Sequence, residues 1–350
     1  MSSLPRLATT LPWTGLLGIA IFWFLAVPTA DHVARQGFTH SWLALLAIPA
    51  AYLLYRWPFL LGVALALGGT WLRLVHAQLP ETSDQLTVGR AALAGVLAGQ
   101  NPYGHGFVES WPPGAPFVYG PLELLVAALG VEGQILAAFG TMLLLAWQRT
   151  FITLAVYSAQ YFVVQFTATG INDLVPGFLI MAGLLTLERH RVAGAVLLAL
   201  AAGVKPYALA WFPPAIGYGG AVVAVALIAL TGVIWSPLAL WGPGSFLRSV
   251  ELAAGTHPFP ENTLNTPALR VLAVPLAIAA IFVRRWWLMV VSGTVIFSVV
   301  LFLDKWASYG YWLVILPLLG MLAERTVMPR LQAALRALPD RSPTTAAPAS

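Results

Sequence analysis

Long apolar runs make up most of the chain, and polar residues gather in short stretches between them. A helix needs roughly 20 apolar residues to cross the hydrocarbon core of a membrane, with about 17 as a practical minimum. By this criterion we predict about 12 membrane spans (roughly 10 to 13). They cover residues 12–29, 41–55, 58–76, 132–148, 151–168, 173–187, 191–204, 206–218, 220–238, 267–283, 286–302 and 308–323. Several runs are short, and Pro213-Pro214 makes 206–218 a candidate for a half crossing.

The run pattern predicts an all-α fold: a polytopic membrane helix bundle with short interfacial helices in its first large external loop. We expect one transmembrane domain over residues 1–330, in which two additional spans (12–55) precede a core of spans (58–323). The Pro-, Ala- and Thr-rich residues 331–350 are expected to form a disordered cytoplasmic tail. The first apolar run also fits a cleaved signal peptide loosely, and this alternative stays open.

Composition supports a membrane protein, because 59% of the residues are hydrophobic, only 9% are charged and the mean hydropathy is +0.82. Soluble domains carry about 25% charged residues. The net charge of +5 is explained by Arg residues that flank spans, and no basic cluster indicates nucleic acid. Because the chain has no cysteine, disulfides, thiolate catalysis and cysteine-ligated metals are excluded.

Orientation follows from the Lys and Arg residues of short loops, which favour the cytoplasmic side. With both termini cytoplasmic, that face carries Arg6, Arg56, Arg149, Arg189, Arg191, Arg284, Arg285, Arg325, Arg330, Arg336 and Arg341. The stretch from Pro116 to Gly130 must then be a short helix at the outer leaflet rather than a complete span. Half-spanning backbone is tolerated only where protein or a water-filled cavity covers it, so we expect a cavity here.

The longest polar interruption, residues 84–122, would lie outside the cell in this topology. Thr82-Ser83-Asp84-Gln85 has the form of a capping box, which predicts a helix with Thr82 as its N-cap and Gln85 reaching back to it. Gly99 is the predicted stop of this helix. Asp84 would lie in the first turn, facing outward, where the helix dipole favours its ionised form. Acids are also common in first turns for structural reasons alone, and that alternative stays open.

Several motifs follow Asp84 in order: Asn101-Pro102-Tyr103, Tyr119-Gly120-Pro121-Leu122, Gly170-Ile171-Asn172-Asp173 and Lys205-Pro206. Over residues 84–215 this series resembles the integral-membrane glycosyltransferases of the C superfamily. More narrowly, it resembles bacterial polyprenyl-phosphate-mannose-dependent mannosyltransferases. The resemblance implies an inverting hexosyltransferase of the bacterial plasma membrane, most commonly a mannosyltransferase. Its partners would be a polyprenyl-phosphate sugar donor, a lipid or glycan acceptor at the extracytoplasmic face, and membrane lipids.

The resemblance also implies roles for individual residues. An acid in the first external loop is the catalytic base in that family, and Asp84 occupies the matching position; Asp31, directly after the first run, is its rival. Candidate substrate-binding residues are Lys205, Arg90, Asn101, Tyr103, Tyr119, Asn172 and Asp173. Lys205, Arg90 and Lys305 are candidates to stabilise the charge of the departing lipid phosphate, although a lysine at a helix end also snorkels to the interface. The chain departs from the family pattern at Val88, where members often have Tyr.

The remaining polar residues predict little further chemistry. The external histidines are His32, His40, His76, His105 and His257, and they show no metal-ligand spacing. We therefore expect no cofactor and no tightly bound metal, while two carboxylates could hold Mg²⁺ or Mn²⁺ transiently. Asp304 and Lys305 are expected to form an interfacial ion pair, and residues 241–267 to form loops over the mouth of the cavity. A transporter or flippase, or a non-catalytic subunit for envelope assembly, remains the alternative function.

Overall fold

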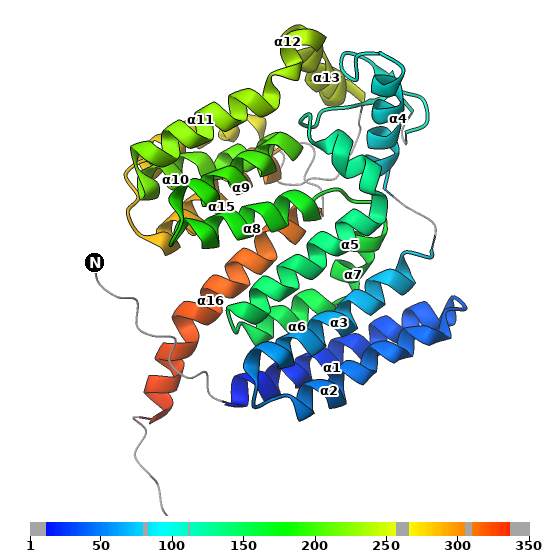
Figure 1. Cartoon of the computed structure of the whole chain (residues 1–350), viewed down its shortest axis with the longest axis vertical. Coiled ribbons are helices and arrows are strands. Elements are labelled where there is room, and N and C mark those ends of the chain that lie inside the picture. Colours follow the sequence, from blue (N-terminus) through cyan, green and yellow to red (C-terminus); the bar gives the residue numbers. More distant parts are fainter. Residues whose placement is uncertain (1–11, 80–82, 111–112, 257–265, 305–309, 337–350) are drawn as a thin grey trace, which may run out of the picture.

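A computed structural model of the chain describes residues 12–79, 83–110, 113–256, 266–304 and 310–336. This described part is built almost entirely of helices that run back and forth across the molecule (Figure 1). Its two strands, β1 (Gly106–Phe107) and β2 (Ala115–Pro116), pair antiparallel in the long polar loop. The architecture confirms the predicted all-α class.

The helical elements follow one another closely along the chain. In order they are α1 (Pro12–Arg35), η1 (Thr39–Leu46), α2 (Ala47–Leu53), α3 (Pro58–His76), α4 (Gln85–Leu97), α5 (Glu123–Trp147), α6 (Phe151–Ala159), α7 (Tyr161–Ala168), α8 (Leu174–Leu187), α9 (Arg191–Val204), η2 (Pro206–Trp211), α10 (Phe212–Gly219), α11 (Ala221–Trp235), α12 (Pro237–Trp241), α13 (Pro243–Thr256), η3 (Pro267–Leu272), α14 (Ala273–Ala280), α15 (Trp286–Phe302) and α16 (Gly310–Arg336), where η marks a 3-10 helix.

Five helices of the described part are long and apolar enough to cross a membrane, and the bent pair of α6 and α7 adds a sixth candidate. The five are Trp13–Arg35, Pro58–His76, Glu123–Trp147, Ala221–Trp241 and Gly310–Arg330. Between them lie apolar helices of 10–17 residues, such as α8, α9 and α15. These lengths and compositions indicate a membrane protein, and the number of 12 spans stays a prediction.

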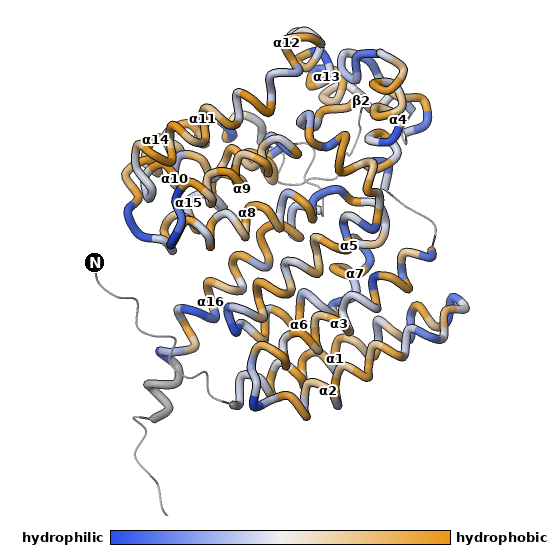
Figure 2. The backbone as a smooth tube through the Cα atoms, in the orientation of Figure 1, coloured by the Kyte–Doolittle hydropathy of each residue, from blue (hydrophilic) through white to orange (hydrophobic). Residues whose placement is uncertain are grey.

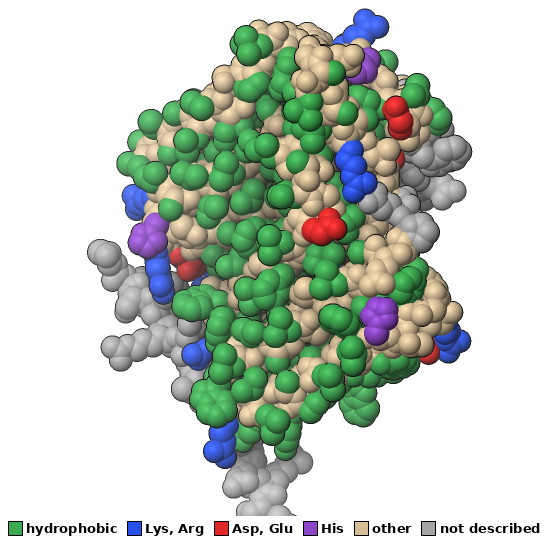
Figure 3. Space-filling view, turned by 45° about the vertical axis from the view of Figure 1, so that its right-hand side comes forward, with side chains coloured by type: hydrophobic (Ala, Val, Ile, Leu, Met, Phe, Trp, Pro, Cys, Tyr) green, Lys and Arg blue, Asp and Glu red, His purple; other side chains and the backbone are tan. Residues whose placement is uncertain are grey.

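Apolar side chains also cover the outside of the molecule. Hydrophobic residues follow the helices along most of their length, and hydrophilic ones gather at helix ends and in loops (Figure 2). Hydrophobic side chains are spread over the face drawn in Figure 3, and few of its side chains are charged. α11 is apolar throughout and buries only Val223 and Leu227. A helix that is apolar on all sides, and that neighbouring helices leave largely uncovered, is suited to contact with lipid.

Two glycines divide the helices of the polar loop. α4 stops at Gly99, as predicted, where φ is +77° and the Gln100 amide donates to the Gly95 carbonyl oxygen. Gly130 lies within α5 at φ 61° and ψ −150°, a conformation that glycine adopts readily. It separates a short helix, 123–129, from a longer one, 131–147. The predicted short helix before Gly130 is confirmed, while its place at the outer leaflet stays a prediction.

Charged side chains of two other helices hold both ends of α6. At its N-terminus, the Glu324 carboxylate of α16 accepts hydrogen bonds from the Thr153 backbone amide and hydroxyl, the latter at 2.6 Å. At its C-terminus, the fully buried Arg73 of α3 donates to the carbonyl oxygens of Tyr157 (2.6 Å) and Ser158 (2.9 Å). An anion at the N-terminus and a cation at the C-terminus both match the helix dipole. Arg73 also satisfies carbonyls that the 57° bend between α6 and α7 would leave free.

Several predicted segments differ in the structure. Residues 241–267, expected as loops, contain the helix α13, which contacts β2. α16 continues to Arg336 and so includes the first six residues of the expected disordered tail, 331–336, while residues 337–350 lie outside the described part. Asp304 pairs with Arg270 at 2.9 Å, and its expected partner Lys305 lies outside the described residues.

Candidate functional site

The end of the polar loop is anchored on the C-terminal end of α9. The Gly120 amide donates to the Val204 carbonyl oxygen and the Leu122 amide to the Gly203 carbonyl oxygen, both at 2.9 Å. These carbonyls belong to the last turn of a helix, where they have no partner within it. A Cβ atom on Gly120 would collide with the Gly203 carbonyl, so the approach requires glycine. The anchor places the loop beside Lys205, the next residue after α9.

Lys205 forms a buried ion pair with Asp173, the residue that precedes α8. The Lys205 Nζ atom lies 2.6 Å from Asp173 Oδ1, and the two side chains are 5% and 0% exposed. The Tyr207 hydroxyl of η2 donates to the same oxygen at 2.8 Å. Nζ also lies over the Tyr119 ring, 5.1 Å from its centre, in a cation–π contact. The charge of Lys205 is therefore engaged within the protein.

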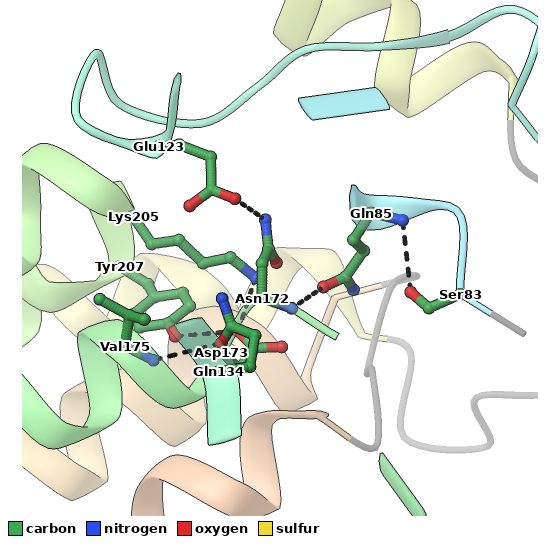
Figure 4. A network of polar contacts seen from close by, with 9 residues as sticks. All are labelled: Ser83, Gln85, Glu123, Gln134, Asn172, Asp173, Val175, Lys205 and Tyr207. Atoms are coloured by element: carbon green, nitrogen blue, oxygen red, sulfur yellow. Dashed lines mark hydrogen bonds and ion pairs between the residues drawn. The ribbon is translucent and has the colours of Figure 1, made fainter. Parts of the chain in front are cut away.

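A second set of polar contacts joins α4, α5 and α8 (Figure 4). The Asn172 side-chain amide donates to Glu123 Oε1 at 2.6 Å, and its backbone amide donates to Gln85 Oε1 at 3.1 Å. Gln134, beyond the break in α5, accepts from the Val175 amide at 3.4 Å. We name the group the buried polar cluster; it consists of Gln85, Tyr119, Glu123, Gln134, Asn172, Asp173, Lys205 and Tyr207.

Sequence reasoning missed Glu123, Gln134 and Tyr207 as members of this cluster. Glu123 is fully buried, although it directly follows the Tyr119-Gly120-Pro121-Leu122 motif. An acid at the start of an apolar run is expensive to bury, and this signal could have singled it out. Gln134, within the same run, offers a weaker version of the same signal.

Asp84 lies directly before α4, at its N-cap position, and makes no side-chain capping bond there. The predicted capping box is wrong for Gln85, since the Gln85 side chain accepts from Asn172 and its backbone amide donates to the Ser83 hydroxyl at 3.3 Å. Thr82, the expected N-cap, lies outside the described residues. α4 thus begins at Gln85, and the Gln85 side chain ties this helix to α8.

The surroundings of Asp84 differ from the expected outward-facing, ionised carboxylate. Asp84 is half-buried, and desolvation raises its pKa above the usual value, while the charge of Lys205 partly opposes this shift. Desolvation disfavours the charged form of an acid. Burial also raises the pKa of Tyr119, and the nearby acids Asp84, Glu123 and Asp173 add to the effect. Asp84 is therefore electrostatically coupled to the buried polar cluster.

Two predicted binding residues, Asn101 and Tyr103, hold the loop together instead of joining the cluster. The Asn101 side chain donates to the Trp241 carbonyl oxygen at 2.6 Å and accepts from the Tyr103 amide at 2.9 Å. The Tyr103 ring packs against Phe117, Trp241 and Phe246. The Tyr103 hydroxyl donates to the Tyr119 carbonyl oxygen at 3.0 Å. Both residues thus fix the position of Tyr119 from outside the cluster.

The remaining candidates lie apart from these contacts. Arg90 is exposed on α4, where its guanidinium lies near Gly130. Asp31 pairs with Arg35 at 2.7 Å on an exposed face of α1. Val88 is buried in a hydrophobic cluster of the loop. Within the described ranges, no group of three or more His, Asp or Glu side chains is arranged to hold a metal ion.

Comparison with known proteins assigns the chain to no family. No family model, no curated protein and no solved structure matches it. Its fold and site define a helical protein with the character of a membrane protein, in which an anchored loop covers a buried polar cluster.

Proposed function

We propose that the protein is a membrane glycosyltransferase that moves a hexose, with mannose as the first candidate, from a polyprenyl-phosphate donor to a lipid or glycan acceptor. One observation supports this most: the predicted residues Tyr119, Asn172, Asp173 and Lys205 gather in one buried cluster, and Asp84 is electrostatically coupled to it. These five residues come from four separate parts of the sequence, and only the resemblance to the glycosyltransferase family had grouped them.

Asp84 acts as the general base in this proposal. The acceptor hydroxyl gives its proton to the Asp84 carboxylate while its oxygen attacks the anomeric carbon. The bond between that carbon and the phosphate oxygen breaks, and the polyprenyl phosphate leaves with the bonding electrons, which inverts the anomeric configuration. A base works best when its pKa lies near the working pH, so the raised pKa of Asp84 suits the role.

The cations take different parts. Lys205 is engaged with Asp173, so we assign it to ordering the cluster. Arg90, exposed on the same helix that Asp84 precedes, is assigned to the lipid phosphate, where a guanidinium can make two parallel hydrogen bonds. Asn101 and Tyr103 hold the loop that carries Tyr119.

The proposed topology has about 12 crossings in a bacterial plasma membrane, both termini in the cytoplasm and the anchored loop at the extracytoplasmic face. Some crossings would then be made by short pairs of 3-10 and α-helix, such as η2 with α10. Helices shorter than the usual span are accommodated where the bilayer thins or neighbouring helices cover them.

A transfer assay tests the proposed function. Membranes that contain the wild type or Asp84→Asn are incubated with radiolabelled polyprenyl-phosphate mannose and crude lipid acceptors. We expect the substitution to reduce transfer on the order of 100-fold to 10,000-fold, the range that general-base catalysis contributes. Asp31→Asn is the matched control and should keep full activity. Equal transfer by wild type and Asp84→Asn would remove Asp84 from the chemistry.

The bend between α6 and α7 favours a second candidate, a transporter or flippase, because such proteins bind substrates at broken helices. An apolar pocket of about 650 Å³ lies at this bend. It is lined by Val156, Gln160, Phe162, Val163, Phe166, Trp312, Leu313 and Leu316. Movement of lipid-linked sugar across proteoliposomes without any transfer to an acceptor would favour this candidate.

A further inference from the structure

Several side-chain atoms of the buried polar cluster have no hydrogen-bond partner among the described residues. Glu123 Oε2, Asn172 Oδ1 and Asp173 Oδ2 are buried and have no hydrogen-bond partner in the described part of the chain. One donor, Gln134 Nε2, is in the same condition. Buried polar groups are nearly always hydrogen-bonded, so each exception needs an explanation.

The donors that bond to Asp173 and Glu123 are already in use. Lys205 Nζ is bonded to Asp173 Oδ1 and lies over the Tyr119 ring. The Asn172 side-chain amide is bonded to Glu123 Oε1. The Tyr207 hydroxyl donates to Asp173 Oδ1. Asn172 Oδ1 and Asp173 Oδ2 therefore fit a ligand that supplies hydrogen-bond donors, while the Glu123 carboxyl oxygen accepts when ionised and donates when protonated.

The kind of ligand follows from charge. A phosphate group would bring only acceptors and negative charge to a wall that holds the unpaired acceptors of Asn172 and Asp173, and Lys205 beside them is already bonded to Asp173. Sugar hydroxyls donate hydrogen bonds and carry no charge. The wall is therefore suited to the sugar part of a glycolipid and unsuited to its phosphate.

We propose that Glu123, together with Asn172, binds a hydroxyl group of the donor hexose and so determines sugar specificity; this rests on the proposed function. Asn172 links Glu123 to Gln85, and Gln85 directly follows Asp84. Glu123, which binds the sugar hydroxyl, and Asp84, the proposed base, are thus linked through one network, which orients the sugar relative to Asp84. Because these atoms are buried, the sugar reaches them when the loop before α5 moves away from the end of α9, which leaves the bond between Asn172 and Glu123 in place.

The test compares wild type with Glu123→Gln. The substitution preserves the size of the side chain and the bond from Asn172, but it replaces Oε2 with an NH₂ group, which donates hydrogen bonds and cannot accept them. The donors are polyprenyl-phosphate mannose and its 2-, 3-, 4- and 6-deoxy analogues. Equilibrium binding is measured without an acceptor, and kcat/KM of transfer is measured with one.

We expect the wild type to disfavour one deoxy analogue on the order of 100-fold or more, as sites do that bind a substrate hydroxyl through buried polar groups. Glu123→Gln should weaken binding of the complete sugar by a similar factor and show no further loss with that analogue, because the two changes remove the same contact. Glu123→Asp, which keeps the carboxyl group and withdraws it by one methylene, should lose the same discrimination. It serves as the second variant if Glu123→Gln does not fold.

Glu324→Gln is the matched control, since it changes an acid at the far end of α6 and should leave the order of preference among donors intact. Equal losses for all donors in both Glu123 variants, or a wild type that ignores every deoxy change, would overturn the inference. Selective binding without any transfer would overturn the proposed function alone. A wild type that binds none of these donors would overturn both.

Discussion

At the scale of single residues, burial decides what each acid of the site can do. Asp173 is fully buried and has Lys205 and Tyr207 as partners, so it serves as a fixed centre for the ends of α8 and α9 and for η2. Asp84 is half-buried, and desolvation has the largest effect on its pKa. A carboxyl group with a raised pKa exchanges its proton nearer to neutral pH, whereas Asp173 is held by two fixed partners. The two acids are therefore suited to different work.

The raised pKa of Asp84 predicts the acid limb of the pH profile of transfer. A base must be ionised, so kcat/KM should fall as the pH drops through this pKa, at a pH above the ordinary value of 3.8. The folded state also binds the proton more tightly than the unfolded state, so this group favours folding at low pH and less so as pH rises. Measuring kcat/KM against pH checks the prediction, with Asp31→Asn as control. A limb at or below 3.8 would contradict it.

Sequence predicted some residues of the site and misassigned others for a definite reason. Tyr119, Asn172 and Lys205 were predicted as binding residues and share the cluster, whereas Asn101 and Tyr103 bind the loop to α12 and α13. A motif shows that a polar or aromatic side chain is present, but the chain path decides which way it faces. That path depends on contacts with Trp241 and Phe246, more than 100 residues away in sequence.

At the scale of elements, the anchor between the loop and α9 depends on the absence of one side chain. Gly120→Ala should push the loop away from the Gly203 carbonyl and so displace Tyr119 and Glu123, which flank the anchor. A misplacement of about 1 Å in a site can reduce the rate about 100-fold, so we expect transfer to fall more than 10-fold. Gly232→Ala in α11 is the control, since a Cβ there meets nothing within 4 Å. Transfer assays on both variants check this, and full activity of Gly120→Ala would show that the anchor is dispensable.

The predicted helices agree best where an apolar run is bounded by charged residues. α9 and α15 have the predicted bounds of 191–204 and 286–302. The runs at 206–218 and 267–283 instead begin as 3-10 helices, each with proline in its first turn. α13 was missed because its flanking Gly and Pro residues suggested loops, although proline is well tolerated at the start of a helix. An apolar run alone does not distinguish these cases.

At the scale of the whole molecule, the proposed function requires the anchored loop to face outward. A pair of reporters, one active only outside the cytoplasm and one only inside, can be fused after Asn101 and after Arg189. We expect the first fusion to report the outside and the second the inside, because the positive charge at Arg189 and Arg191 favours the cytoplasm. A cytoplasmic signal after Asn101 would contradict the topology and the site together.

The sequence predicts the class of the molecule, which the described helices support, whereas the number of crossings stays a prediction. A composition this apolar leaves little choice of class. Helix length is a weaker guide to the number of crossings, because by length α5 is one helix of 25 residues although Gly130 divides it. It also leaves out α8 and α9, which have 14 residues each. Breaks of this kind depend on tertiary contacts that satisfy the freed backbone groups, and those contacts are not visible in a run of apolar letters.

The charged caps of α6 also have a consequence for how the protein is made. Glu324 lies 171 residues after Thr153, whose amide it binds. At a translation rate of roughly 5–20 residues per second, the ribosome delivers this cap about 10–35 seconds after it has made α6. Arg73, in contrast, is synthesised before α6 and is already present when α6 is made. A nascent α6 therefore has the partner for its C-terminal end from the start, while the partner for its N-terminal end is made only with α16.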